Sequence, residues 1–228
     1  FWGDASGPAS PGNLFGFGDT ISENVLFDPW LETDPLLPTC CSSIAFIPGL
    51  EASRLYRQST VFEDKLWEPN RNSDVQQLML STTTGESIDP SMYTRDVLDE
   101  PLGLSISGNI YKGFLERMHD LVEGGVVNAF EPLPYDWRFD VRDVVTSNIH
   151  LPNNASYRMT DRIEALAEAS QTGKVTLITH SNGGLVAKEL LSELVRLGKD
   201  NLVDRVIMVA APELGTPEGK AYSISSAP

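Results

Sequence analysis

The stretch that most constrains the fold of this chain is 174–197, in which a strand pattern passes directly into a helix pattern. Residues 175–179 are a short apolar run typical of a buried strand, and 182–197 have the character of a helix. Only a sharp turn can join the two, and the residue at its apex is forced into a strained backbone conformation. Ser181 occupies that apex, and Gly183 lets the strand and the helix approach closely.

Residues 179–183, Thr-His-Ser-Asn-Gly, match the G-x-S-x-G nucleophile elbow, with threonine in the first glycine position. An elbow would lift the Ser181 hydroxyl clear of the sheet. The N-terminus of the following helix would supply N–H groups and partial positive charge for a developing oxyanion. The alternative is an ordinary turn serine between a strand and a helix, and the flanking elements favour the elbow.

An earlier apolar run, 42–47, predicts a buried parallel strand that ends at Pro48-Gly49. An α/β hydrolase places its other oxyanion donor on the loop after an early strand, so the backbone N–H of Leu50 is the candidate donor. Without the elbow, Pro-Gly would be no more than a turn.

The rest of the chain alternates between strand-like and helix-like segments. The further strand-like segments are 126–130 and 203–210, and the further helix-like segments are 110–122 and 156–171. This alternation predicts a three-layer α/β domain with a mostly parallel sheet over residues 43–228, and together with the elbow it indicates an α/β-hydrolase fold. We expect 203–210 to be buried and 139–155 to be irregular.

Two parts of the chain do not fit the alternation. Residues 1–42 are rich in glycine and proline and predict an N-terminal linker or tail. Residues 57–104 form an excursion from the sheet, in which Ser73 would cap a short helix ending at Leu80; a cap or lid and a plain surface insertion fit it equally. Because the chain starts at Phe1, we expect a removed leader or an internal piece of a longer protein.

The charge balance argues against some partners. The sequence has 32 acidic and 17 basic residues, a formal net charge of −15, which argues against nucleic acid and against electrostatic docking on anionic lipid. It is compatible with an extracellular or cell-surface protein, which we favour over a cytoplasmic one. No apolar run approaches the roughly 18–20 residues of a transmembrane span.

The two cysteines, Cys40 and Cys41, are neighbours in the sequence. A disulfide between neighbours is strained, because bridged Cα atoms usually lie farther apart than one peptide unit. We therefore expect free thiols or intermolecular pairing. The sequence has no CxxC pattern, and we expect neither a metal nor a cofactor.

A serine nucleophile needs a base and a carboxylate that orients the base, and in α/β hydrolases they follow the serine in the order Asp or Glu, then His. No histidine follows Ser181, since the three in the chain are His119, His150 and His180. We expect the triad to be completed by sequence beyond residue 228. The fold would then lack its last strands, and these residues alone would hydrolyse esters at a rate near zero.

Four strings together resemble the lecithin:cholesterol acyltransferase family of α/β hydrolases. They are Phe-Ile-Pro-Gly-Leu-Glu-Ala-Ser at 46–53, Pro-Tyr-Asp-Trp-Arg at 134–138, Thr-His-Ser-Asn-Gly at 179–183 and Ala-Ala-Pro-Glu-Leu-Gly-Thr-Pro at 210–217. The resemblance implies acyl transfer from a lipid ester through an acyl-enzyme on Ser181. It also implies that the N–H groups of Leu50 and Asn182 form the oxyanion hole.

This chain departs from the family pattern at Thr179, whose Cβ needs space beside the helix, and in the cysteines, which do not match those of the family's lid. The leading hypothesis is a serine-dependent lipid esterase or O-acyltransferase. The alternative is a non-catalytic binding module of a larger surface or secreted protein. The family strings are the only feature of the sequence that disfavours a peptidase or thioesterase on the same scaffold.

Overall fold

The computed structural model describes residues 41–58, 63–69, 71–100 and 109–215. The chain divides into the units Phe1–Leu37 and Pro38–Pro228, and every described residue belongs to the second. Apart from residues 41 and 42, the predicted N-terminal linker therefore lies outside the described part of the chain.

A parallel sheet forms the centre of the second unit. Its strand order is β5 (Phe130–Pro132), β1 (Ser43–Ile47), β8 (Val175–His180) and β9 (Val203–Val209). All neighbouring pairs are parallel, so the carboxyl ends of β1 and β8 lie side by side, with Ile47 opposite Thr179. The loop after β1 and the turn after β8 are therefore brought together at one edge of the sheet.

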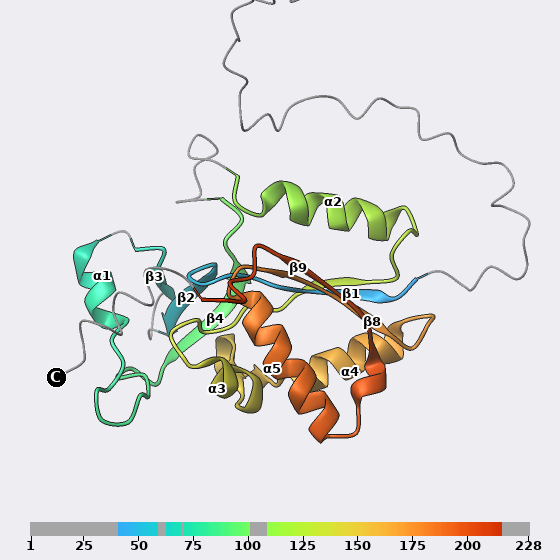
Figure 1. The fold of residues 1–228 in the computed structure, drawn as a ribbon. Coiled ribbons are helices and arrows are strands. Elements are labelled where there is room, and N and C mark those ends of the chain that lie inside the picture. The colour runs from blue at the N-terminus through green and yellow to red at the C-terminus, as the bar shows by residue number, and fades with distance from the viewer. Residues whose placement is uncertain (1–40, 59–62, 70, 101–108, 216–228) are drawn as a thin grey trace, which may run out of the picture. The chain divides into compact units, whose positions relative to one another are not determined.

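Helices cover both faces of this sheet (Figure 1). Helix α2 (Lys112–Glu123) lies on one face, whereas α3 (Val141–Thr146), α4 (Met159–Ala169) and α5 (Gly183–Arg196) lie on the other. This arrangement confirms the predicted α/β class and its mostly parallel sheet. None of the described helices is long and apolar enough to cross a membrane.

Successive side chains of β8 point to opposite faces of the sheet and belong to two different hydrophobic clusters. Val175 and Leu177 are fully buried and belong to the cluster that contains Leu190 of α5. The intervening Ile178 packs into a second cluster, which Phe46 of β1 forms with residues at the start of α2. Both faces of the sheet are thus apolar, as expected for parallel strands covered on both sides.

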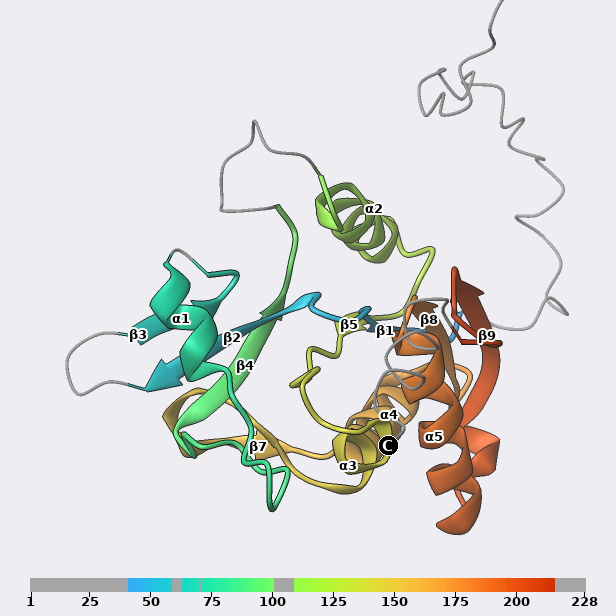
Figure 2. The same ribbon diagram turned by 60° about the vertical axis from the view of Figure 1, so that its left-hand side comes forward.

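The predicted excursion forms a separate antiparallel sheet (Figure 2). Its strand order is β3 (Glu63–Trp67), β2 (Ser53–Gln58) and β4 (Met92–Val97), and α1 (Asn72–Gln77) follows β3 in the chain. The sheet begins at Ser53, before the predicted boundary at residue 57. Its role as a lid stays a prediction.

Helix α1 is capped differently from the prediction. Its N-cap is Arg71, whose backbone N–H donates to the Asp74 carboxylate at 2.9 Å. The Ser73 hydroxyl donates to the same carboxylate at 3.3 Å, so Ser73 lies inside the first turn and does not cap it.

The strand predicted at 126–130 is wrong in position, because β5 begins only at Phe130. The N–H groups of Val126 and Val127 donate to the Leu121 carbonyl, at 2.9 and 3.1 Å, and continue the turn that ends α2. Two consecutive valines suggest a strand, but these backbone bonds hold them in a loop.

The stretch 139–155, predicted to be irregular, contains α3 and the strand β6 (Ile149–His150). Asp140 caps α3 by accepting from the Arg142 N–H at 2.9 Å. Strand β6 pairs with β7 (Ser156–Tyr157), and this pairing delays the start of α4 from the predicted residue 156 to Met159.

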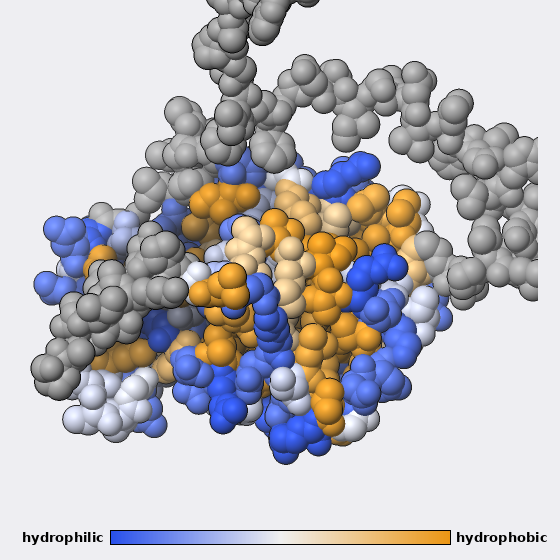
Figure 3. Space-filling model, in the orientation of Figure 1, coloured by the Kyte–Doolittle hydropathy of each residue, from blue (hydrophilic) through white to orange (hydrophobic). Residues whose placement is uncertain are grey.

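The prediction that 203–210 is a buried strand is only half right. Strand β9 is present, but Ile207, Met208 and Val209 are 43, 37 and 50 % exposed. The strand pairs with β8 on one edge, and no described strand pairs with its other edge. Figure 3 shows apolar side chains at the surface where β9 crosses this face.

The prediction of free thiols is wrong for Cys41, which is disulfide-bonded. Cys40, the only other cysteine of the sequence, lies outside the described residues.

Truncation of Leu190 tests the core on the α5 face. We expect Leu190→Ala, at a fully buried position, to lower the free energy of unfolding by about 2–5 kcal/mol. The matched control is Leu197→Ala at the end of the same helix, where the side chain is 40 % exposed and the loss should be below about 1 kcal/mol. Urea denaturation of both variants measures the difference, and equal losses would contradict this description of the core.

Candidate active site

The elbow serine lies at the turn between a strand and a helix. β8 ends at His180 and α5 begins at Gly183, and Ser181 between them has a φ of 51°, in the left-handed region. Its N–H donates to the Val209 carbonyl at 2.8 Å, and its carbonyl accepts from the Gly184 N–H at 3.0 Å. These bonds hold a backbone conformation that is costly for a residue with a side chain. The hydroxyl makes no hydrogen bond to any described residue.

Gly183 lets the helix start against the end of β1. A Cβ at this position would lie 2.3 Å from the Ile47 carbonyl oxygen and 2.6 Å from that of Pro48. These separations are far below van der Waals contact, so only glycine fits here. The first turn of α5 is therefore packed directly on the loop that carries Leu50.

The absence of a side chain at Gly184 makes room for Ala211, the second residue after β9. A Cβ on Gly184 would lie 2.5 Å from the Cβ of Ala211, whereas its separation of 3.5 Å from Thr179 Oγ1 would be an ordinary contact. Thr179 itself is fully buried, so the fold holds a threonine at the position of the elbow's first glycine. Thr179 Oγ1 has no hydrogen-bond partner among the described residues.

The loop after β1 lies against the nucleophile. A Cβ on Gly49 would lie 3.1 Å from the Ser181 Cβ. The loop turns through Glu51, whose φ of 58° is left-handed, and the Ala52 N–H donates to the Gly49 carbonyl at 3.3 Å. Trp67 Nε1 of the second sheet donates to the Glu51 carbonyl at 2.6 Å and holds this turn from outside.

The two predicted oxyanion donors flank the serine from different elements. Leu50 follows Gly49 in the loop, and Asn182 follows Ser181 at the start of α5. Neither backbone N–H donates to a hydrogen bond within the described part of the chain. Among the described residues, neither N–H is thus committed to another acceptor, and the role of both in an oxyanion hole stays a prediction.

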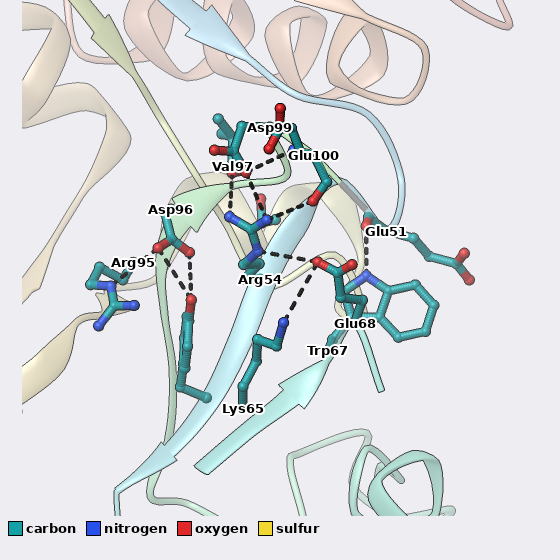
Figure 4. A network of polar contacts seen from close by, with 12 residues as sticks. Glu51, Arg54, Lys65, Trp67, Glu68, Arg95, Asp96, Val97, Asp99 and Glu100 are labelled. Atoms are coloured by element: carbon teal, nitrogen blue, oxygen red, sulfur yellow. Dashed lines mark hydrogen bonds and ion pairs between the residues drawn. The ribbon is translucent and has the colours of Figure 1, made fainter. Parts of the chain in front are cut away.

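An ionic network anchors the chain just after this loop (Figure 4). Arg54 donates to the Glu68 carboxylate at 3.3 Å, the Asp99 carboxylate at 2.7 Å and the Glu100 carbonyl at 2.9 Å. Burial alone would raise the pKa of Asp99, but hydrogen bonds from the Glu100 N–H and from Arg54 lower it below its ordinary value. The network joins the start of β2 to the segments that follow β3 and β4.

The Pro-Tyr-Asp-Trp-Arg string is held by local contacts. The Arg138 guanidinium donates two hydrogen bonds to the Asp136 carboxylate, of 2.9 and 2.6 Å, and the Arg138 side chain is only 4 % exposed. Trp137 Nε1 donates to the Ser53 carbonyl at 3.1 Å and fixes the string on the core. No local sequence pattern marks Tyr135, whose side chain contacts both the loop and the elbow.

None of the three histidines bonds to Ser181. The ring of His119 packs edge-on against Phe130, with centroids 5.7 Å apart. His150 lines a cavity of about 690 Å³ between β4 and α3. Nδ1 of His180 lies 2.7 Å from the hydroxyl of Tyr111, a second residue that no local pattern marks. Both tyrosines were missed because contacts across the fold leave no periodic signal in the sequence.

Most acids after Ser181 have partners elsewhere. The pairs are Glu189 with Arg142, Glu193 with Arg196, Glu213 with Lys188, and Asp204 with the Thr176 hydroxyl. Asp200 lies in a short 3-10 turn, and Glu218 lies outside the described residues. No described residue therefore forms a base or a base–carboxylate pair at the serine.

Comparison with known proteins gives a family match. The family model described as lecithin:cholesterol acyltransferase matches residues 92–226, which include the elbow and the Pro-Tyr-Asp-Trp-Arg string. The match does not extend to the loop that carries Leu50. No curated protein matches the chain.

Gly183→Ala tests the close packing of the elbow. We expect a loss of about 1–3 kcal/mol in the free energy of unfolding, because the new Cβ must push α5 away from the Ile47 and Pro48 carbonyls. The control is Gly113→Ala in α2, where the Cβ would meet only the side chain of Asn109. The denaturation midpoint of each variant is compared with that of the unmodified chain. A Gly183→Ala variant with an unchanged midpoint would contradict the packing described above.

The Arg54 network gives a pH-dependent prediction. Because the folded pKa of Asp99 is lowered, its contribution to stability is present above its unfolded pKa of about 4 and is lost as the pH falls through the folded value. We expect Asp99→Asn to reduce the free energy of unfolding at pH 7 and to have a smaller effect at pH 3. Asp120→Asn, at an exposed position on α2, should change neither value. If Asp99→Asn lowered the free energy of unfolding equally at pH 7 and at pH 3, that result would contradict a stabilising ion pair.

Proposed function

Because this chain belongs to the lecithin:cholesterol acyltransferase family, we propose that Ser181 is the nucleophile of a lipid esterase or O-acyltransferase. The family indicates acyltransferase or esterase activity on lipids. The observation that carries the assignment of Ser181 is its left-handed backbone, with a φ of 51°, at the turn from β8 into α5. That conformation is costly for serine, and function is a common reason for keeping it.

In the proposed reaction the Ser181 oxygen attacks the carbonyl carbon of a lipid ester, and its proton passes to a base. The carbonyl oxygen becomes an oxyanion, which accepts hydrogen bonds from the N–H groups of Leu50 and Asn182. The C–O bond then breaks, the alcohol leaves with the proton, and the acyl group stays on Ser181. Water or a second alcohol attacks this acyl-enzyme, so a hydrolase and a transferase share every step up to that point.

We propose that the base and its carboxylate are supplied by sequence outside these 228 residues. The support is that no described histidine bonds to Ser181 and that most of the described acids after it have other partners. The order in related hydrolases places an Asp and then a His after the nucleophile. A non-catalytic binding module would also lack a base at Ser181. The experiment must therefore separate an enzyme from a binding module.

The experiment compares the complete gene product with the 228-residue chain. We expect the complete product to hydrolyse a p-nitrophenyl ester and to be labelled by a fluorophosphonate probe, and the 228-residue chain to show neither. Ser181→Ala in the complete product should lower kcat by about 10⁴-fold or more. The control is Ser192→Ala, whose hydroxyl donates to the Lys188 carbonyl on the exposed face of α5.

Two results would decide against the enzyme. One is a complete product that is neither labelled nor active and whose coding sequence lacks a later Asp and His, which would identify a binding module. The other is ester hydrolysis that survives Ser181→Ala, which would place the chemistry on another residue.

A further inference from the structure

Two buried tyrosines bridge the loop after β1 and the elbow. Tyr135 follows β5 and is 1 % exposed, and Tyr111 precedes α2 and is 7 % exposed. Each hydroxyl contacts one residue of the loop and one residue next to Ser181. Resting on the function proposed above, we propose that Tyr111 and Tyr135 are positioning residues, which hold the N–H of Leu50 in register with that of Asn182.

The Tyr135 hydroxyl uses both its donor and its acceptor. It donates to the Pro48 carbonyl at 3.1 Å and accepts from Nδ2 of Asn182 at 3.3 Å. A carbonyl only accepts, so the hydroxyl proton is committed to Pro48, and Asn182 must present its NH₂ group. Burial raises the pKa of Tyr135 to about 12, so the proton that this bond requires is kept at neutral pH.

The Tyr111 hydroxyl makes the matching bridge on the other side of the serine. It accepts from the Gly49 N–H at 3.2 Å and lies 2.7 Å from Nδ1 of His180. A backbone N–H only donates, so the hydroxyl proton is available for His180, which then carries its own proton on Nε2. This tautomer of His180 gives every polar atom of the bridge a partner.

The two tyrosine bridges hold the loop at Pro48 and Gly49, next to Leu50, whose own side chain is not anchored by burial. The Leu50 side chain is 56 % exposed, so burial does not hold the residue in place. Its amide position is instead set by the two residues before it, Pro48 and Gly49, and each of these bonds to one tyrosine. A displacement of about 1 Å in an active site can lower a rate by about 100-fold, so this register matters for an oxyanion hole.

The first experiment measures kcat and KM of Tyr111→Phe and Tyr135→Phe in the complete gene product. We expect kcat to fall by about 10- to 100-fold with KM changed less than about threefold. A trifluoromethyl ketone, which forms an oxyanion on Ser181, should bind more weakly by the same factor as kcat/KM falls. The control is Tyr56→Phe, at a residue that is 4 % exposed and whose hydroxyl donates to Asp96 in the second sheet. Tyr56→Phe should lower the free energy of unfolding and leave kcat unchanged.

The second experiment needs no activity and uses the 228-residue chain. ¹⁵N NMR of labelled histidine should show His180 with its proton on Nε2, and Tyr111→Phe should shift it toward a mixture of tautomers. A His180 protonated on Nδ1 in the unmodified chain, or an unchanged signal in Tyr111→Phe, would overturn the Tyr111 bridge.

The outcomes separate this inference from the function on which it rests. If Ser181→Ala stays active, the proposed function fails. If Ser181→Ala is inactive but both tyrosine variants keep their kcat and their affinity for the ketone, the positioning role alone fails. A loss of kcat in Tyr56→Phe equal to that in Tyr135→Phe would also reject it, because the effect would then be one of general stability.

Discussion

The absence of one atom, the Cβ of Gly183, sets the geometry of the candidate site. A methyl group there would lie 2.3 Å from the Ile47 carbonyl, so helix α5 could not begin where it does. Because β1 and β8 are neighbouring parallel strands, this contact places the end of one against the turn of the other. The nucleophile, its following amide and the loop before Leu50 all take their positions from that contact.

The second sheet contributes to the same geometry from outside the central one. Trp67 of β3 holds the carbonyl of Glu51, and Arg54 of β2 connects the residues after the loop to the segment that follows β4. The segment that interrupts the α/β pattern is thus attached to the loop through hydrogen bonds. Its sequence fits a cap or lid and a plain surface insertion equally, and these contacts support the loop after β1 in either case.

The sequence predicted the parts of the fold whose signal is local. Strands β1 and β8 and helices α2, α4 and α5 show apolar runs or periodicity, and the elbow around Ser181 follows from a strand, a turn and a helix in succession. Helix α3 was missed because its six residues are too few to show a period. The exposure of β9 depends on the neighbours of that strand, which no local pattern reveals.

The tyrosine bridges mark a second limit of sequence reasoning. Tyr135 bonds to Pro48, 87 residues earlier, and to Asn182, 47 residues later. Such bonds depend on the complete fold, and a single tyrosine in a loop carries no sign of them. The string that contains Tyr135 carries part of the family resemblance, but its letters do not show which distant groups its hydroxyl would contact.

The threonine at position 179 bears on how elbows of this kind are searched for. A search string that demands glycine two places before the serine would discard this chain, although the turn is intact. The positions of the turn at which a Cβ would meet a neighbour below 3 Å are Gly183 and Gly184, against Ile47 and Ala211. Searches that demand glycine only after the serine would therefore recover this chain.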